Sequence, residues 1–185
     1  MKNKIMIIAM LIAILMCASC EESQTKKNYD EQFTQIKDME IKQAIELVND
    51  WNFSKSEINS FITPEELTVT FPDQRMVKIA LPEDEMYVAV APYIENTHTC
   101  STHYPSSCQG EMTQESFAVK INEKEGEVIF EGEKTTLKNG FFELWIPRDK
   151  ELIVLIEKDQ RSVEVSLISD DEAGTCITTT KMMNL

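Results

Sequence analysis

The 185-residue chain lacks the patterns that mark several common enzyme classes. It holds only two histidines, and it shows no serine–histidine–aspartate set, no glycine-rich phosphate loop and no paired carboxylates beside an apolar pocket. Neither a Cys-x-x-Cys pair nor a thioredoxin-like order of elements is present. These absences argue against hydrolytic chemistry and against turnover catalysis in general. A thiol-disulfide oxidoreductase of the cell envelope remains an alternative because the chain has free thiols to offer.

Basic residues are scarce as well. The chain has 18 lysines and arginines against 32 aspartates and glutamates, which gives a net charge of −14. A surface of this sign repels polyanions and therefore disfavours nucleic acid and anionic lipid as partners. Dispersed acidic residues otherwise indicate an ordinary solvated surface.

Long hydrophobic runs are absent except for one near the N-terminus. The run from Ile5 to Met16 follows two lysines and is shorter than the roughly twenty apolar residues that a membrane span needs. Small residues then precede Cys20, a pattern that resembles a bacterial lipobox. We therefore expect a signal peptide over residues 1–19, lipidation of Cys20, and a polar tether over residues 20–28 that leads to the folded body. Plain export with cleavage nearby is the alternative.

The segment after the tether is predicted to be helical. From Tyr29 to Trp51 the apolar residues recur mostly at helical spacing, which predicts an amphipathic helix with a break near Asp38. The sequence from Ser54 to Glu57 has the form of a capping box and predicts a second short helix, so the helical segment covers residues 29–66. The apolar face of the first helix must be buried against the β part of the chain or against a second copy. The second case would make the protein a homodimer.

The rest of the chain, residues 67–185, is predicted to be β-rich. Short alternating stretches separated by turn residues predict strands at Leu67–Phe71, Met76–Leu81, Met86–Ile94, Phe117–Ile121, Glu127–Glu131, Gly140–Ile146, Glu151–Glu157, Ser162–Ile168 and Ile177–Lys181. Short strands at this spacing favour an antiparallel sheet or sandwich. The predicted fold class is thus α+β, with an N-terminal helical segment followed by a mostly antiparallel β domain.

Five side chains of this β domain carry soft or borderline metal donors: His98, Cys100, His103, Cys108 and Cys176. The first four lie in one loop over residues 97–110 that is rich in small and polar residues. Cys17 leaves with the signal and Cys20 carries the lipid, so three thiols remain in an oxidising compartment and cannot all pair within the chain. Thiolate and imidazole donors in this pattern indicate a site for a soft or borderline transition metal.

The residues leave the metal and the pairing of the thiols open. Three thiolates suit Cu(I), whereas a mixed set of cysteine and histidine also satisfies tetrahedral Zn(II). A disulfide from Cys100 to Cys108, or from Cys108 to Cys176, would instead make the protein a stapled structural lipoprotein. Cys176 can join the other donors only if the last strand runs beside the strand ending at Ile94 or beside the segment after Gly110.

Several stretches together resemble the CueP family of exported bacterial copper-binding proteins. They are His98-Thr99-Cys100, His103-Tyr104, Cys108-Gln109-Gly110-Glu111, Asn139 to Asp149, and Gly174 to Thr179. The resemblance implies copper handling in the cell envelope, including the holding of Cu(I) and copper resistance. It also implies copper delivery to recipients such as an exported Cu,Zn superoxide dismutase.

The resemblance also implies a role for each donor. The three cysteines of the family fall on Cys100, Cys108 and Cys176. Cys108 and Cys176 would be the permanent Cu(I) ligands, and Cys100 would assist reduction of Cu(II) or complete the site. His98 and His103 would suit initial capture of Cu(II) or Zn(II). The lipid anchor is a departure from the family, because it would tie the protein to a membrane rather than leave it free in a periplasm.

Overall fold

The structure, a computed structural model, describes residues 28–53, 57–124 and 126–185. The predicted signal peptide, Cys20 and nearly all of the tether lie outside the described residues. No helix within these three ranges has the length and apolar character required to cross a bilayer.

The elements follow one another in the order helices first and strands afterwards. The helices are α2 (Asp30–Ile36) and α3 (Ile41–Phe53). The strands are β1 (Asn59–Ile62), β2 (Glu66–Thr70), β3 (Met76–Ala80), β4 (Glu85–Val90), β5 (Ser116–Glu123), β6 (Val128–Thr135), β7 (Phe142–Pro147), β8 (Glu151–Lys158), β9 (Arg161–Ile168), β10 (Cys176–Ile177) and β11 (Met183–Asn184). The chain is therefore mostly β, as the sequence predicts.

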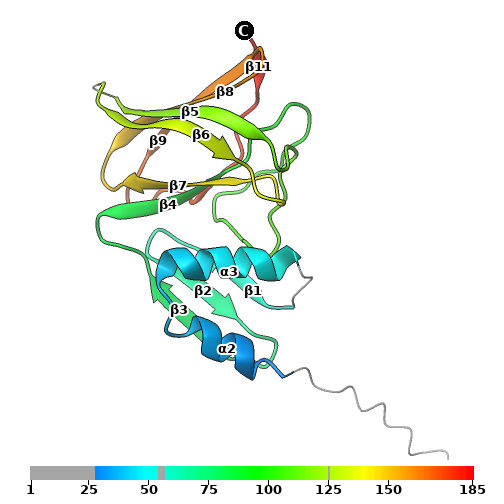
Figure 1. Ribbon diagram of the computed structural model, residues 1–185. Coiled ribbons are helices and arrows are strands. Elements are labelled where there is room, and N and C mark those ends of the chain that lie inside the picture. Colours follow the sequence, from blue (N-terminus) through cyan, green and yellow to red (C-terminus); the bar gives the residue numbers. More distant parts are fainter. Residues whose placement is uncertain (1–27, 54–56, 125) are drawn as a thin grey trace, which may run out of the picture.

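The N-terminal part is a small sheet, β1-β2-β3, covered by the helices (Figure 1). The predicted break near Asp38 is confirmed, since α2 ends at Ile36 and α3 begins at Ile41. Ile45 and Val48 of α3 are buried in the same core as Leu67 of β2. The apolar face of α3 is thus buried within the chain, and homodimer formation stays a prediction.

The second short helix predicted after Ser54 is wrong. The residues that follow the gap at 54–56 form strand β1, which pairs antiparallel with β2 so that Ile62 lies opposite Leu67. In β1 the side chains of Ser60 and Ile62 are buried while Asn59 is exposed. Burial of every second side chain stabilises an extended strand, because successive side chains of a strand point to opposite faces. This tertiary packing outweighs the local capping signal for a helix.

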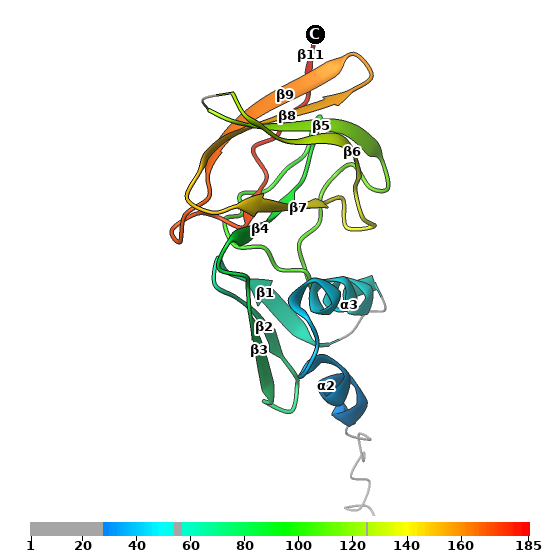
Figure 2. The same cartoon turned by 60° about the vertical axis from the view of Figure 1, so that its left-hand side comes forward.

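The C-terminal part consists of two sheets, β10-β4-β7 and β11-β9-β8-β5-β6, that face each other (Figures 1 and 2). Among the described strands every pairing is antiparallel except that of β10 with β4. A buried core between the two sheets holds Val88 of β4 and Val119 of β5. The predicted mostly antiparallel β domain is confirmed.

Strand β4 contributes side chains to the hydrophobic cores of both parts. Met86 and Val88 belong to the core between the two C-terminal sheets, whereas Tyr87 and Ala89 belong to the core that contains α3. Successive side chains of a strand point to opposite faces, so a strand buried on both sides reads as a continuous apolar run. The loop with the histidines and cysteines begins at Thr97, a few residues after β4 ends at Val90.

Candidate metal centre

The loop that carries four of the five predicted ligands is held at its start by Glu111. The carboxylate of Glu111 accepts hydrogen bonds from the backbone N–H groups of Asn96 at 2.6 Å, Glu95 at 3.0 Å and Ile94 at 3.3 Å. The bonds from the Asn96 amide and then the other two amides lower the pKa of Glu111. One side chain thus fixes the turn that leads into the loop.

The end of the same loop is held by a close approach of two glycines. The N–H of Gly110 donates to the carbonyl of Asn139 at 2.6 Å. A Cβ on Gly110 would lie 2.6 Å from the carbonyl oxygen of Gly140, which itself has a φ of +79°. Only glycine meets both conditions without strain. The turn predicted at Asn139-Gly140 is therefore also a brace for the loop.

Cys176 reaches the loop because β10 runs beside β4. Cys176 lies opposite Ala89 in this parallel pair, and its N–H donates to the carbonyl of Ser101 at 3.0 Å. A Cβ added to Gly174 would lie 2.9 Å from that same carbonyl oxygen, so the two segments touch. The structural condition for Cys176 to join the other donors is met.

Thr175 ties three distant segments together and was missed by sequence reasoning. Its buried hydroxyl donates to the carbonyl of Ile62 at 2.6 Å and accepts from the N–H of His103 at 2.9 Å. The N–H of Ile62 in turn donates to the carbonyl of His103 at 2.9 Å. Strand β1, the loop and β10 are thereby locked in register. The only signal in the sequence was the place of Thr175 within the Gly174 to Thr179 stretch.

The structure brings all five predicted donors together in two groups. His98, Cys100 and Cys108 form one group, and His103, Cys108 and Cys176 form the other. Within each group the ligand atoms lie within 4.8 Å of one another. The sulfurs of Cys100 and Cys108 are 3.7 Å apart, and the three described cysteines are free thiols. Donors bound to one ion through bonds of about 2.0–2.3 Å stand roughly 3–4 Å apart, so either group needs only a small contraction.

His103 is the donor whose surroundings most clearly indicate a bound metal. Its side chain has no exposed surface, and within the described part of the chain neither ring nitrogen makes a hydrogen bond. The ring lies against Phe141, with centroids 4.8 Å apart, and near Tyr87 at 6.0 Å. A buried polar atom without a partner costs free energy, and coordination to a metal would remove this cost.

The electrostatics of the three thiols differ. A hydrogen bond from the Cys176 thiol, aided by one from the Tyr104 amide and opposed by burial, holds the pKa of Cys108 far below its usual range. Donation to Cys108 and burial raise the pKa of Cys176, and burial raises the pKa of Cys100. Cys108 is thus the thiol of the cluster that ionises most easily, and a thiolate is the form of cysteine that binds metal.

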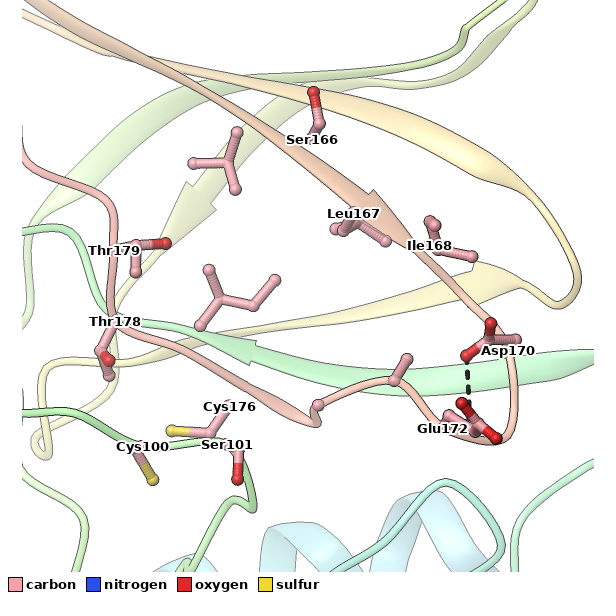
Figure 3. Close-up of a pocket in the computed structure, with 14 residues that line it drawn as sticks. Cys100, Ser101, Ser166, Leu167, Ile168, Asp170, Glu172, Cys176, Thr178 and Thr179 are labelled. Carbon is pink, nitrogen blue, oxygen red and sulfur yellow. Dashed lines mark hydrogen bonds between the residues drawn. The ribbon is translucent and has the colours of Figure 1, made fainter.

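A surface cavity of about 480 Å³ leads to this cluster. Figure 3 shows Cys100 and Cys176 on one side of the cavity, beside Ser101, with the end of β9 on the other side. Asp170 and Glu172 lie on its rim, and no lysine or arginine is among its described lining residues. The cavity gives an ion or a partner access to the half-buried Cys100, while Cys176 lies in its wall with only 4% of its surface exposed.

A polar network that sequence reasoning did not find supports the cluster from the helical side. The carboxylate of Glu143 accepts hydrogen bonds from the Tyr87 hydroxyl at 2.8 Å and from the Asn49 side-chain amide at 2.7 Å. Burial, and then the Glu143 charge, raise the pKa of the fully buried Tyr87. The network joins α3 to β4 and β7. Its member Tyr87 also lies beside the ring of His103, with ring centroids 6.0 Å apart.

Comparison with known proteins identifies the family. A family profile described as "Periplasmic copper-binding protein CueP" matches residues 41–181. The chain belongs to the CueP family. A solved structure described as "Crystal Structure of S.CueP" matches with a TM-score of 0.75 and 25% sequence identity, and the match covers 85% of this chain and 98% of that chain. No curated protein matches.

Family membership links the cluster of donors to copper binding. This CueP family member belongs to a group of periplasmic copper-binding proteins, and all five donors lie inside the matched residues 41–181. The predicted resemblance is confirmed. Cys20 lies outside both the match and the described residues, so its lipidation stays a prediction.

Proposed function

We propose that this CueP family member is a lipid-anchored copper carrier of the cell envelope. Cys20 ties it to a membrane, and the thiolate cluster holds Cu(I) with Cys108 and Cys176 as the principal ligands. The observation that carries the proposal is the buried, unpartnered imidazole of His103 within coordinating distance of both sulfurs. Holding copper in this way contributes to copper resistance.

Cu(I) fits the group of His103, Cys108 and Cys176 better than Zn(II) does. Two sulfurs and one imidazole suit the low coordination number of a soft ion, whereas zinc prefers four ligands. Zinc would have to recruit Cys100 or water as its fourth ligand. A zinc-binding lipoprotein is therefore the alternative, and the donor count separates the two.

Stoichiometric reduction of Cu(II) is a second part of the proposal. The sulfurs of Cys100 and Cys108 are 3.7 Å apart, close enough to join after a small movement. Formation of a disulfide from these two thiols releases two protons and two electrons, and the electrons reduce two Cu(II) ions to Cu(I). The step consumes Cys108, so reduction in one molecule competes with Cu(I) binding in that same molecule.

Delivery is proposed to occur through the cavity beside Cys100 and Cys176. An acceptor that presents a soft donor there can replace one thiol at a time, which avoids release of free copper. An exported Cu,Zn superoxide dismutase is the kind of acceptor that we propose. The acidic rim at Asp170 and Glu172 favours an acceptor surface with positive charge.

The proposal is tested by thiol protection and Cu(I) competition on the reduced protein. We expect one Cu(I) per chain to protect two or three thiols from alkylation. Cys108→Ser and Cys176→Ser should each lower Cu(I) affinity far more than His98→Ala, with Ser166→Ala at the cavity wall as the matched control. Equal and small losses in all variants would count against thiolate coordination. Efficient turnover of a disulfide substrate would favour the oxidoreductase instead.

A further inference from the structure

We infer that the five donors form two successive stations for one Cu(I) ion, and that Cys108 belongs to both. The outer station is His98, Cys100 and Cys108, and the inner station is His103, Cys108 and Cys176. This inference deepens the proposed copper-carrier function and rests on it. It assigns the two histidines to different stages of binding rather than to one shared site.

The two stations differ in their exposure to solvent. In the outer station His98 is exposed, Cys100 is half-buried and only Cys108 is buried, whereas all three residues of the inner station are buried. The exposed fractions are 0% for His103, 4% for Cys176 and 7% for Cys108. An arriving ion therefore meets the outer station first, and an ion held in the inner station is shielded from solvent.

The rings of the two histidines lie against one and the same residue. The buried Phe141 ring has its centroid 6.4 Å from that of His98 and 4.8 Å from that of His103. The loop segment near His98 is also tied to the C-terminal segment, since the Thr97 hydroxyl donates to the carbonyl of Thr178 at 2.8 Å. Both imidazoles are thus positioned beside the sulfurs rather than left free in solution.

The shared Cys108 sulfur makes transfer between the stations a ligand exchange. The ion stays bound to Cys108 while the Cys176 sulfur and a His103 nitrogen replace the Cys100 sulfur and a His98 nitrogen. Cys176 gives up its thiol proton as it binds, and Cys100 takes a proton from solvent as it leaves. Copper remains Cu(I) throughout, so neither an oxidant nor a reductant is needed.

The stations predict that the two histidines control different quantities. Removal of the outer imidazole should slow capture of Cu(I) while the final complex stays intact. Removal of the inner imidazole should weaken the final complex while capture stays fast. A single five-donor site predicts instead that both substitutions weaken the same equilibrium.

The experiment is anaerobic stopped-flow transfer of Cu(I) from its bathocuproine disulfonate complex to the full chain, with equilibrium competition against the same chelator. For His98→Ala we expect the capture rate to fall about tenfold and the equilibrium affinity to change less than about twofold. For His103→Ala we expect the equilibrium affinity to fall about tenfold or more with the capture rate nearly unchanged. Thr99→Ala, in the same exposed loop segment, is the matched control and should change neither quantity.

A second measurement needs no substitution at the buried His103. In ¹⁵N spectra of wild-type protein loaded with one equivalent of Ag(I), a redox-inert mimic of Cu(I), only the His103 ring should show a coordination shift. Equal affinity losses in the two histidine variants, or shifts of both rings, would overturn the two stations in favour of one site. An unchanged capture rate in His98→Ala would overturn the outer station. Failure of the wild type to bind Cu(I) would instead refute the copper-carrier function itself.

Discussion

The backbone N–H of Cys176 donates a hydrogen bond to the carbonyl of Ser101 at 3.0 Å, across 75 positions of sequence. This bond, with the parallel pairing of Cys176 opposite Ala89, sets the last cysteine beside the loop that holds the other four donors. The site is therefore a product of topology, because β10 must return to the edge of β4 for the donors to meet. Changes that loosen this contact should weaken both the fold and copper binding.

Thr175→Val should destabilise the protein and lower its Cu(I) affinity. The substitution keeps the shape of the side chain but leaves the carbonyl of Ile62 and the N–H of His103 without their buried partner. Each such loss costs about 1–3 kcal/mol. Denaturant unfolding of the metal-free protein measures the change. Thr175→Ser keeps the hydroxyl and should stay much closer to wild type, and an equal loss in both variants would contradict the role of the hydrogen bonds.

Gly140→Ala should destabilise the protein more than Gly126→Ala. Both glycines have positive φ, +79° and +102°, so both variants place a Cβ in a backbone conformation that costs about 1–2 kcal/mol. Only at Gly140 does the new Cβ also meet backbone, since the carbonyl oxygen of Gly110 would lie 2.5 Å away, whereas nothing lies within 4 Å at Gly126. Thermal unfolding of the two variants checks the difference. Equal shifts in melting temperature would mean that the close approach carries no weight.

Glu111→Gln should weaken the start of the His/Cys loop and change its pH dependence. The pKa of Glu111 is lowered in the fold, so its contribution to stability is present above the pKa of the unfolded chain and is lost as pH falls through the lowered value. Because the carboxylate is exposed, we expect only about 0.5–1 kcal/mol at neutral pH. Unfolding free energies at neutral and acidic pH test this. A difference between variant and wild type that does not shrink in acid would contradict the assignment.

Tyr87→Phe should weaken the hydrogen-bond network that supports the site without removing any metal ligand. The substitution removes the hydroxyl that donates to Glu143 at 2.8 Å and leaves every metal donor in place. We expect a loss of about 1 kcal/mol in unfolding free energy and a small fall in Cu(I) affinity. Chelator competition and denaturant unfolding measure the two effects. A fall in affinity as large as that of Cys108→Ser would show that Tyr87 does more than support the site.

Local sequence patterns predicted most elements because their periodicity reports burial directly. The break near Asp38 and the strands on either side of the turn at Asn139-Gly140 follow from such patterns and from turn chemistry. The second helix failed because β1 is held extended by its hairpin with β2 and by the hydrogen bond from the Ile62 N–H to the carbonyl of His103, a contact across 41 positions that no local pattern encodes. The strand predicted at Ile177–Lys181 was also too long, because β10 ends at Ile177. Beyond Ile177 the segment is held by single contacts, such as the Thr180 hydroxyl on the carbonyl of Ala91, rather than by a continuous ladder.

The ligands could be predicted from the sequence, but their support could not. Soft donors are rare residue types, and their gathering in one loop is visible by eye. Thr175 and Glu143 are common polar residues whose roles depend on what burial places beside them. The division of the donors into two groups that share Cys108 likewise depends on three-dimensional placement alone.

X-ray absorption spectroscopy at the copper edge, on protein loaded with one equivalent of Cu(I), tests the central claim most directly. The account predicts a three-coordinate Cu(I) ion with two sulfur neighbours and one imidazole nitrogen, and loss of one sulfur neighbour in Cys108→Ser, because Cys108 belongs to both groups of donors. A spectrum with only nitrogen or oxygen neighbours, or one that Cys108→Ser leaves unchanged, would contradict it.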